Sequence, residues 1–185
     1  ATYVSVDNVL GASQAIDHLV SLGHQAIGFI NGHRAAWVSQ QRLKGYHRGL
    51  HQNGLSARSS YVFEGDFLKE SGRKGAEHLL TAHPEITAIF AASDLMAAGA
   101  LEQLQAMGLD VPAQVSVVGF DDQDLSTHVS PTLTTVRQEM YQFGRLAAQE
   151  LITMIGDEEY VPKHVDLPSV LVQRASSGPV RTSKL

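Results

Sequence analysis

The chain has 185 residues, of which 43% are hydrophobic, and a formal net charge of −5 from 14 Lys and Arg against 19 Asp and Glu. This length supports one sizeable core, and the absence of cysteine excludes disulfides, thiolate zinc sites and cysteine nucleophiles. No apolar run reaches the ~18 residues that cross a bilayer, and no basic cluster exceeds Arg73-Lys74. We therefore expect neither a membrane segment nor a nucleic-acid-binding surface in this chain.

Short β-branched runs alternate with stretches of helical periodicity along the chain. The run 2–6 comes first, and the apolar stripe in 11–23 predicts a helix that ends near Gly23. Further strands are predicted at 26–30, 61–63, 86–92 and 115–120, and further helices at 39–53, 70–82, 94–107 and 139–155. Continuously apolar strands are typical of a parallel sheet with helices on both faces. The sequence therefore predicts the α/β class, as a doubly wound, Rossmann-like parallel sheet.

Polar or small residues, and one aromatic, follow the predicted strands. They are Asp7, Asn31-Gly32, Gly65-Asp66-Phe67, Ser93-Asp94 and Asp121-Asp122. In doubly wound sheets ligands bind at the carboxyl ends of the strands, which favours a ligand site here. Taken singly, each Asp is also suited to cap a helix or to shape a loop. Asp121 and Asp122 are adjacent, so in an extended segment they point to opposite sides, which disfavours a catalytic carboxylate pair.

The signatures of enzymes and cofactor sites are absent from the sequence. It has no G-x-G-x-x-G after a strand, no G-x-x-x-x-G-K-[ST] and no G-x-S-x-G. His47 and His51 form an i, i+4 pair of the kind that binds Zn²⁺, but no third ligand follows at a suitable spacing, so we interpret the pair as a solvated helix face. His24 is interpreted as a capping or loop residue. We expect no metal, no cofactor and no enzymatic activity.

Several stretches, in this order and spacing, match one known family. They are VDN at 6–8, HLVSLGHQAIGFING at 18–32, SQQRLKGYHRGL at 39–50, GDFLKESG at 65–72, TAIFAASDLMAAGALEQL at 87–104, GLDVPAQVSVVGFDDQD at 108–124 and PTLTTVRQ at 131–138. Over about residues 3–175 the chain resembles the effector-binding domain of the LacI/GalR family of bacterial transcriptional regulators. The resemblance implies a periplasmic-binding-protein-like fold of type I, with two lobes joined by crossing strands and a ligand cleft between them.

The resemblance also implies that this chain carries part of such a two-lobe domain. Residues 1–175 correspond to an effector-binding fragment in which 9–137 form the second lobe. The helix at 139–156 belongs to the first lobe in the family, so its apolar face needs another cover, such as a second copy, if this chain is alone. The first lobe and the DNA-binding headpiece are expected outside the chain, which starts at Ala1 without Met or a signal segment. Residues 176–185 are expected to be a disordered tail.

Two residues are carried over from the strongest family motifs. Arg42 occupies the Arg of R-x-x-G, which reaches into the cleft in the family, and its guanidinium fork is suited to bridging two ligand oxygens. Asp121 occupies the Asp of G-[FY]-D, where a carboxylate accepts hydrogen bonds from neighbouring hydroxyls of a sugar. Asp122 is expected to be structural.

Five further residues are expected at or near the ligand by position. Phe67 stands where relatives place an aromatic, and Ser93 stands where they often place Asn, which weakens any transfer of ligand identity. Gln138 follows the third crossing strand and is expected to touch ligand or hold the hinge. Trp37, in the loop after Gly32, is a weaker candidate, and Asp94 is a weaker one still because it suits a helix N-cap.

The resemblance implies a sensor of a small polar effector, a sugar or a related metabolite, in a cytoplasmic regulator, most simply a repressor. Operator DNA would be bound through an N-terminal domain outside this chain, in a homodimer that pairs through the apolar side of helix 94–107, unless that stripe is only core. The alternative is a periplasmic sugar-binding protein of a transport system, which would need an export signal upstream of Ala1. The pieces SQQRLKGY and PTLTTVRQ favour the regulators.

Overall fold

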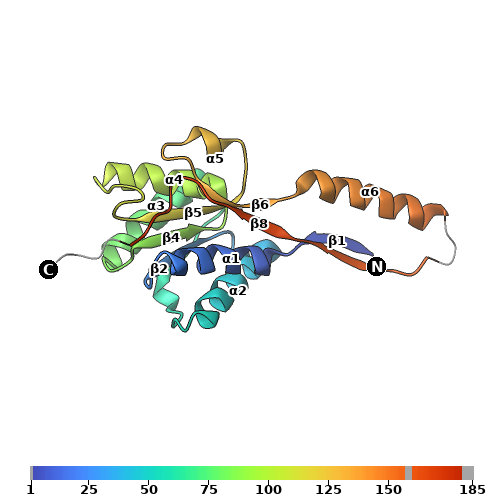
Figure 1. Ribbon diagram of the computed structural model, residues 1–185, viewed down its shortest axis with the longest axis horizontal. Helices are drawn as coiled ribbons and strands as arrows, with labels where there is room; N and C mark the ends of the chain where they lie inside the picture. The colour runs from blue at the N-terminus through green and yellow to red at the C-terminus, as the bar shows by residue number, and fades with distance from the viewer. Residues whose placement is uncertain (1, 157–159, 181–185) are drawn as a thin grey trace.

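The structure, a computed structural model, describes residues 2–156 and 160–180. Its body is a six-stranded sheet in the order β3-β2-β4-β5-β6-β8, and a second sheet pairs β1 with β7 (Figure 1). The strands are β1 (Tyr3–Val6), β2 (Ile27–Asn31), β3 (Val62–Glu64), β4 (Ala88–Ala91), β5 (Ser116–Asp121), β6 (Thr134–Gln138), β7 (His164–Leu167) and β8 (Ser169–Val172). The helices are α1 (Asn8–Ser21), α2 (Trp37–Gln52), α3 (Lys69–Ala82), α4 (Asp94–Ala106), α5 (Leu125–His128) and α6 (Met140–Gly156), with a 3₁₀ turn at Ser59–Tyr61.

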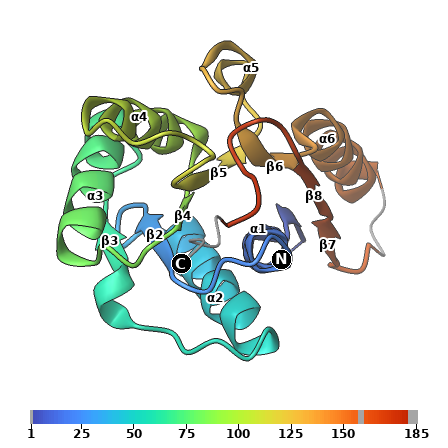
Figure 2. The ribbon, with the colours of Figure 1, turned by 60° about the vertical axis from the view of Figure 1, so that its left-hand side comes forward.

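The doubly wound prediction is confirmed for the body. Strands β3, β2, β4, β5 and β6 are parallel, and the pairs α1–α2 and α3–α4 pack on opposite faces of the sheet (Figure 2). The sheet differs from the prediction in one strand, because β8 returns along β6 in the antiparallel direction. The chain reverses its winding at β2, whose neighbours are β3 on one side and β4 on the other. This reversal creates the switch point at which such sheets bind ligands.

The core of the body is centred on a row of aromatic rings. Phe29 on β2 stacks on Tyr46 of α2 at 5.0 Å between centroids and on Phe90 of β4 at 4.9 Å. Phe120 on β5 continues the row at 6.4 Å from Phe90. All four side chains are fully buried, and the Tyr46 hydroxyl donates to the Ile27 carbonyl at 2.8 Å. The row ties α2 to three strands and so fixes the helix that carries Arg42.

An arm made of β1, β7 and α6 extends from this body (Figure 1). Helix α6 packs on β1, yet none of its residues, all of which the structure describes, is buried. Apolar side chains such as Tyr141, Ile152 and Ile155 are 83%, 71% and 80% exposed. The assignment of 139–156 to another lobe stays a prediction, and the open apolar face is consistent with it.

The prediction of a disordered tail was wrong for residues 176–180. Ser176 and Ser177 are buried, and Ser176 donates its hydroxyl to the Val117 carbonyl at 2.6 Å. The buried His24 ring lies 3.0 Å from the Gly178 carbonyl through Nε2, and Val180 N donates to Leu22 O at 2.9 Å. Polar Ser and Gly residues suggested disorder, but here they complete backbone partners at the amino end of the sheet. Residues 181–185 lie outside the described residues.

Helix α4 does not present the apolar side that suggested a dimer surface. Met96, Leu101 and Leu104 are buried in the body's own core, while Glu102 and Gln105 are exposed. The apolar stripe therefore belongs to the core, and the homodimer stays a prediction that this stripe does not support.

Candidate functional site

The polar side chains that follow the strands gather at the carboxyl end of the six-stranded sheet. This end lies next to the switch point, where α2 starts after β2 and α4 starts after β4. Two carboxylates there, those of Asp121 and Asp122, belong to residues in a left-handed backbone conformation, with φ of 113° and 53°. Non-glycine residues rarely adopt such angles, and they cluster at ligand sites because the surrounding structure must hold them there. The predicted site edge therefore carries backbone strain.

Arg42 lies at the centre of this edge and is 5% exposed. Its Nε donates to Asn8 Oδ1 at 2.9 Å, one terminal nitrogen donates to the Ala92 carbonyl, and the other donates to Asp121 Oδ1 at 3.2 Å. The guanidinium carbon also lies 3.8 Å from the centroid of the Phe120 ring, a cation–π contact. A buried cation needs a counter-charge, and Asp121 supplies it.

The glycine of the R-x-x-G motif explains how Arg42 reaches this place. A Cβ atom at Gly45 would lie 2.4 Å from the Val9 carbonyl oxygen and 2.6 Å from the Ala12 Cβ. Only glycine allows α2 to approach α1 this closely. The motif therefore pairs Arg42 with the helix contact that positions it.

Asp121 joins Arg42 to Gln138. Its Oδ1 accepts from Arg42 and from the Gln138 amide at the end of β6. Burial raises the pKa of Asp121 above its usual range, and the Arg42 charge and the Gln138 hydrogen bond oppose this rise. Three predicted site residues thus meet in one hydrogen-bonded group, which we call the Arg42–Asp121–Gln138 group.

Asp122 has the structural role expected of it. It forms ion pairs with Arg137 of β6 at 2.7 Å and with Arg174 beyond β8 at 2.7 Å, and it accepts from the Ser126 hydroxyl at 3.1 Å. Burial raises the pKa of Asp122, but these hydrogen bonds outweigh it and leave the pKa below its usual value. Asp122 therefore fixes the loop after β5, and its partners differ from those of Asp121.

Asp94 was expected as the N-cap of its helix, and this expectation was wrong. The cap is Ser93, whose hydroxyl accepts from Met96 N at 3.3 Å, while Asp94 is the first helical residue and is fully buried. Asp94 accepts from the Thr135 hydroxyl and, at 2.7 Å, from Gln123 N. Both of its oxygens bind protein donors across β5 and β6, so its contacts are structural.

Ser93, Phe67 and Trp37 surround the Arg42–Asp121–Gln138 group rather than join it. Ser93 follows the carbonyl of Ala92 that binds Arg42, but its hydroxyl serves as a helix cap. Phe67 has a φ of 69° and packs its half-buried ring against Gly32, where a Cβ would lie 2.0 Å from the ring. Trp37 starts α2 instead of lying in a loop, and it is 55% exposed. Among the described residues, no hydrogen bond, ion pair or ring contact joins Phe67 or Trp37 to Arg42.

Sequence reasoning missed Asn8. This residue is 5% exposed and accepts the Arg42 Nε–H, and its own Nδ2 donates to the Val6 carbonyl at 3.0 Å. The signal was present, because Asn8 directly follows a strand end within the VDN stretch. The preceding residue, Asp7, was among the polar residues predicted at the strand ends. It is the N-cap of α1 and accepts from Leu10 N at 2.8 Å.

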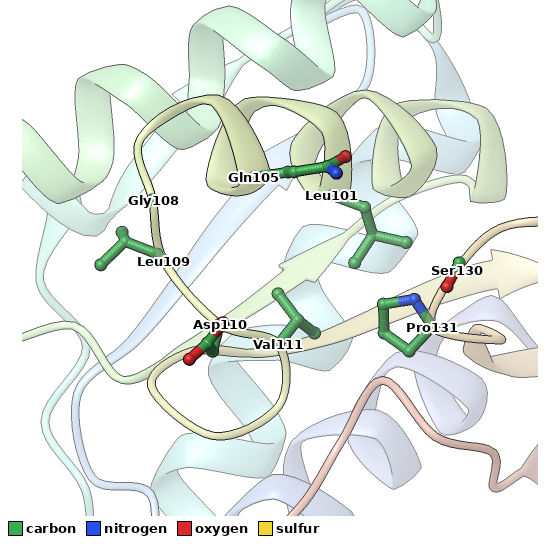
Figure 3. A pocket seen from close by; sticks show the side chains of 8 residues that line it. All are labelled: Leu101, Gln105, Gly108, Leu109, Asp110, Val111, Ser130 and Pro131. Carbon is green, nitrogen blue, oxygen red and sulfur yellow. The ribbon is translucent and has the colours of Figure 1, made fainter.

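A surface pocket lies at the other end of the sheet. It holds roughly 240 Å³ and opens between α4 and the loops that precede β5 and β6 (Figure 3). Its lining includes Leu101, Gln105, Leu109, Val111, Ser130 and Pro131. Asp110 also lines the pocket and is its one charged residue. The pocket lies at the amino ends of the strands and lacks the paired opposite charges of the carboxyl end.

Within residues 2–156 and 160–180, no group of three His, Cys, Asp or Glu side chains could hold a metal ion. In the same part of the chain, no helix combines the length and hydropathy needed to cross a bilayer. His47 and His51 are exposed on α2, as expected of a solvated face.

The comparisons with known proteins agree with this architecture. Residues 16–177 match the profile of the periplasmic binding protein-like domain. The transcriptional regulator CelR of Thermobifida fusca is 37% identical over 175 residues, which are 95% of this chain and 52% of that protein. Catabolite control protein A of Priestia megaterium is 37% identical over 175 residues, 94% of this chain and 53% of that protein. The chain thus spans about half the length of these curated relatives.

A solved structure of a relative has a closely similar fold. The complex of the transcriptional regulator CelR with cellobiose superposes with a TM-score of 0.91 at 37% identity, over 95% of this chain and 54% of that one. The chain therefore belongs to the periplasmic-binding-protein-like domain family and is an effector-binding domain of the LacI/GalR type.

Proposed function

We propose that this chain is the effector-sensing part of a LacI/GalR-type regulator and supplies one half of its ligand cleft. The effector would be a small polar molecule of the sugar class, bound at the carboxyl end of the six-stranded sheet. The observation that carries the proposal is the buried Arg42–Asp121 pair at 3.2 Å, which offers charged donors and acceptors side by side. Vicinal hydroxyls of a sugar both donate and accept, so they match such a pair.

The response would be a change in the relation between two lobes. Gln138 ends β6, the strand that leads out of the body toward α6, and its amide binds Asp121. An effector that takes over the Asp121 contact would alter the restraint on this crossing, and operator affinity would change only as far as the effector binds the two arrangements unequally. Operator binding through a further domain, homodimer formation, a repressor role and a cytoplasmic location belong to the same proposal.

The named relatives favour this reading over a transport receptor, because CelR and catabolite control protein A are regulators. They also favour a binding protein over an enzyme. The contacts within the site agree, since Asp121 and Asp122 bind different partners and do not converge on one position.

Calorimetry on the full-length protein that carries this chain tests the proposal. The probe is a panel of neutral mono- and disaccharides that begins with cellobiose, the sugar in the CelR complex. Arg42→Ala should weaken binding about 100-fold, because hydrogen bonds from a buried charge are each worth about 1.5–3 kcal/mol. Arg42→Lys keeps the charge and should keep the fold, but it should also bind weakly since it lacks the fork.

The matched control is Arg48→Ala, which removes an exposed Arg from the same helix. It should leave the affinity unchanged. Equal affinity in the parent protein and in Arg42→Lys would remove Arg42 from the site, and no binding of any sugar in the panel would contradict the ligand class.

A further inference from the structure

The protein itself uses part of the hydrogen-bonding capacity of Arg42. A guanidinium has five N–H donors in a fixed plane. Asn8 takes the single donor on Nε, and Ala92 and Asp121 each take one donor from a terminal nitrogen. One N–H on each terminal nitrogen is left over by these contacts. Those two donors are the ones available to an effector.

Asn8 is itself fixed in orientation. It is the first residue of α1, it is 5% exposed, and its Nδ2 donates to the Val6 carbonyl at 3.0 Å. Since a carbonyl oxygen accepts and cannot donate, the side-chain amide must turn its nitrogen to Val6 and its oxygen to Arg42. The Asn8–Arg42 hydrogen bond, at 2.9 Å, is therefore set by the backbone of β1.

The contact at Nε constrains Arg42 differently from the other two. Ala92 and Asp121 hold the far end of the guanidinium, and Phe120 supports one of its faces. Asn8 holds the near end, at the nitrogen about which the group would otherwise turn. An Nε–H without its acceptor would be a buried unpaired donor, a costly state that favours a rotated side chain.

We propose that Asn8 is a positioning residue of the effector site: it fixes the plane of the Arg42 guanidinium so that the two remaining donors face the effector. The inference rests on the proposed function, because it concerns the same site. It assigns to the VDN stretch a role through Arg42, distinct from the helix cap that Asp7 provides.

Two variants separate this role from a purely structural one. Asn8→Leu removes both hydrogen bonds of the side chain and keeps its number and branching of heavy atoms. Asn8→Asp keeps an acceptor for the Arg42 Nε–H but gives up the donor to Val6. Ser13→Ala is the matched control, since Ser13 is a buried polar residue of the same helix whose hydroxyl bonds to Gln52 at 3.2 Å, away from Arg42.

The first readout is the side-chain Nε–Hε signal of Arg42 in NMR spectra of this 185-residue chain. We expect a slowly exchanging signal in the parent, in Ser13→Ala and in Asn8→Asp, and its loss or shift in Asn8→Leu. An unchanged signal in Asn8→Leu would overturn the proposal. The second readout is calorimetry with cellobiose in the full-length protein, where Asn8→Leu should weaken binding about 10-fold and Asn8→Asp should restore most of it.

The failures of the two proposals are distinguishable. If Asn8→Asp binds as weakly as Asn8→Leu, an acceptor for the Arg42 Nε–H does not restore binding, which contradicts positioning through this hydrogen bond. If Arg42→Ala weakens binding and Asn8→Leu does not, the result supports Arg42 as part of the effector site and contradicts the positioning role of Asn8. If cellobiose binds none of the proteins, the ligand of the proposed function is wrong, and the NMR signal still decides whether Asn8 fixes Arg42.

Discussion

The body and the arm of this molecule each contain a helix of similar overall hydrophobicity, and the two helices differ in burial. In the body, α4 buries Met96, Leu101 and Leu104 against the sheet. In the arm, α6 buries none of its residues, and Ile152 and Ile155 are 71% and 80% exposed. Contiguous exposed apolar surface commonly marks an interaction site in proteins. Periodicity in a sequence therefore reveals the apolar face of a helix, whereas the element that packs on this face is determined by tertiary structure.

Phe90→Ala in the body should cause the largest loss in the free energy of unfolding. Phe90 is fully buried between Phe29 and Phe120, so its loss removes apolar contacts and leaves a cavity that costs about 3–5 kcal/mol. Ile155→Ala on the arm should change the free energy of unfolding by less than about 0.5 kcal/mol. Urea unfolding followed by circular dichroism measures both. Similar losses for the two variants would mean that α6 is packed in solution.

The two regions should also differ in the sign of their pH dependence. Burial, together with Asp121 and Asp122, raises the pKa of Asp94 in the body to about 7, despite hydrogen bonds from Thr135 and Gln123. An unfolded Asp has a pKa of about 3.9, so between these values the folded chain keeps a proton that the unfolded chain has lost. The contribution of Asp94 to the free energy of unfolding therefore falls as the pH rises from about 4 to about 7.

Glu150 in the arm has the opposite sign. Hydrogen bonds from Lys163 and Tyr160 lower its pKa, so its contribution is present above the unfolded pKa and is lost as the pH falls. The difference between the free energies of unfolding at about pH 5 and about pH 8 should change by up to about 2.7 kcal/mol in Asp94→Asn, because about two pH units separate pH 5 from the raised pKa. This difference should change little in Glu150→Gln, because a carboxylate with a lowered pKa is ionised at both pH values. The same pH dependence of the free energy of unfolding in the parent and in Asp94→Asn would contradict the raised pKa of Asp94.

Much of the body could be predicted from the sequence because its signals are local. The continuous apolar runs predicted β2, β4 and β5 within two residues at each end. Motif order placed Arg42, Asp121 and Gln138 at one edge, and the structure joins them by hydrogen bonds. Helix α1 starts three residues earlier than predicted, because the Asp7 side chain caps it.

The remaining features depend on contacts far apart in the sequence. Asn8 meets Arg42 across 34 positions, and the 176–180 segment meets β5 across about 60. Strand β8 pairs with β6 in the antiparallel direction only because the chain leaves the body through α6 and comes back. The residue type at each position permits these partners without specifying them. The same is true of Ser93, which took the capping role that its neighbour Asp94 was expected to fill.

The smallest expected change in stability comes with an informative change in association. The double variant Ile152→Ser, Ile155→Ser should leave the unfolding of the isolated chain within about 0.5 kcal/mol of the parent, because both side chains are already exposed. The parent chain should self-associate through this face at high concentration, since burying apolar surface contributes about 25 cal/mol per Å². Multi-angle light scattering measures the mass of both. A monomeric parent would mean that α6 finds its cover within its own chain, and the arm would then resemble the body.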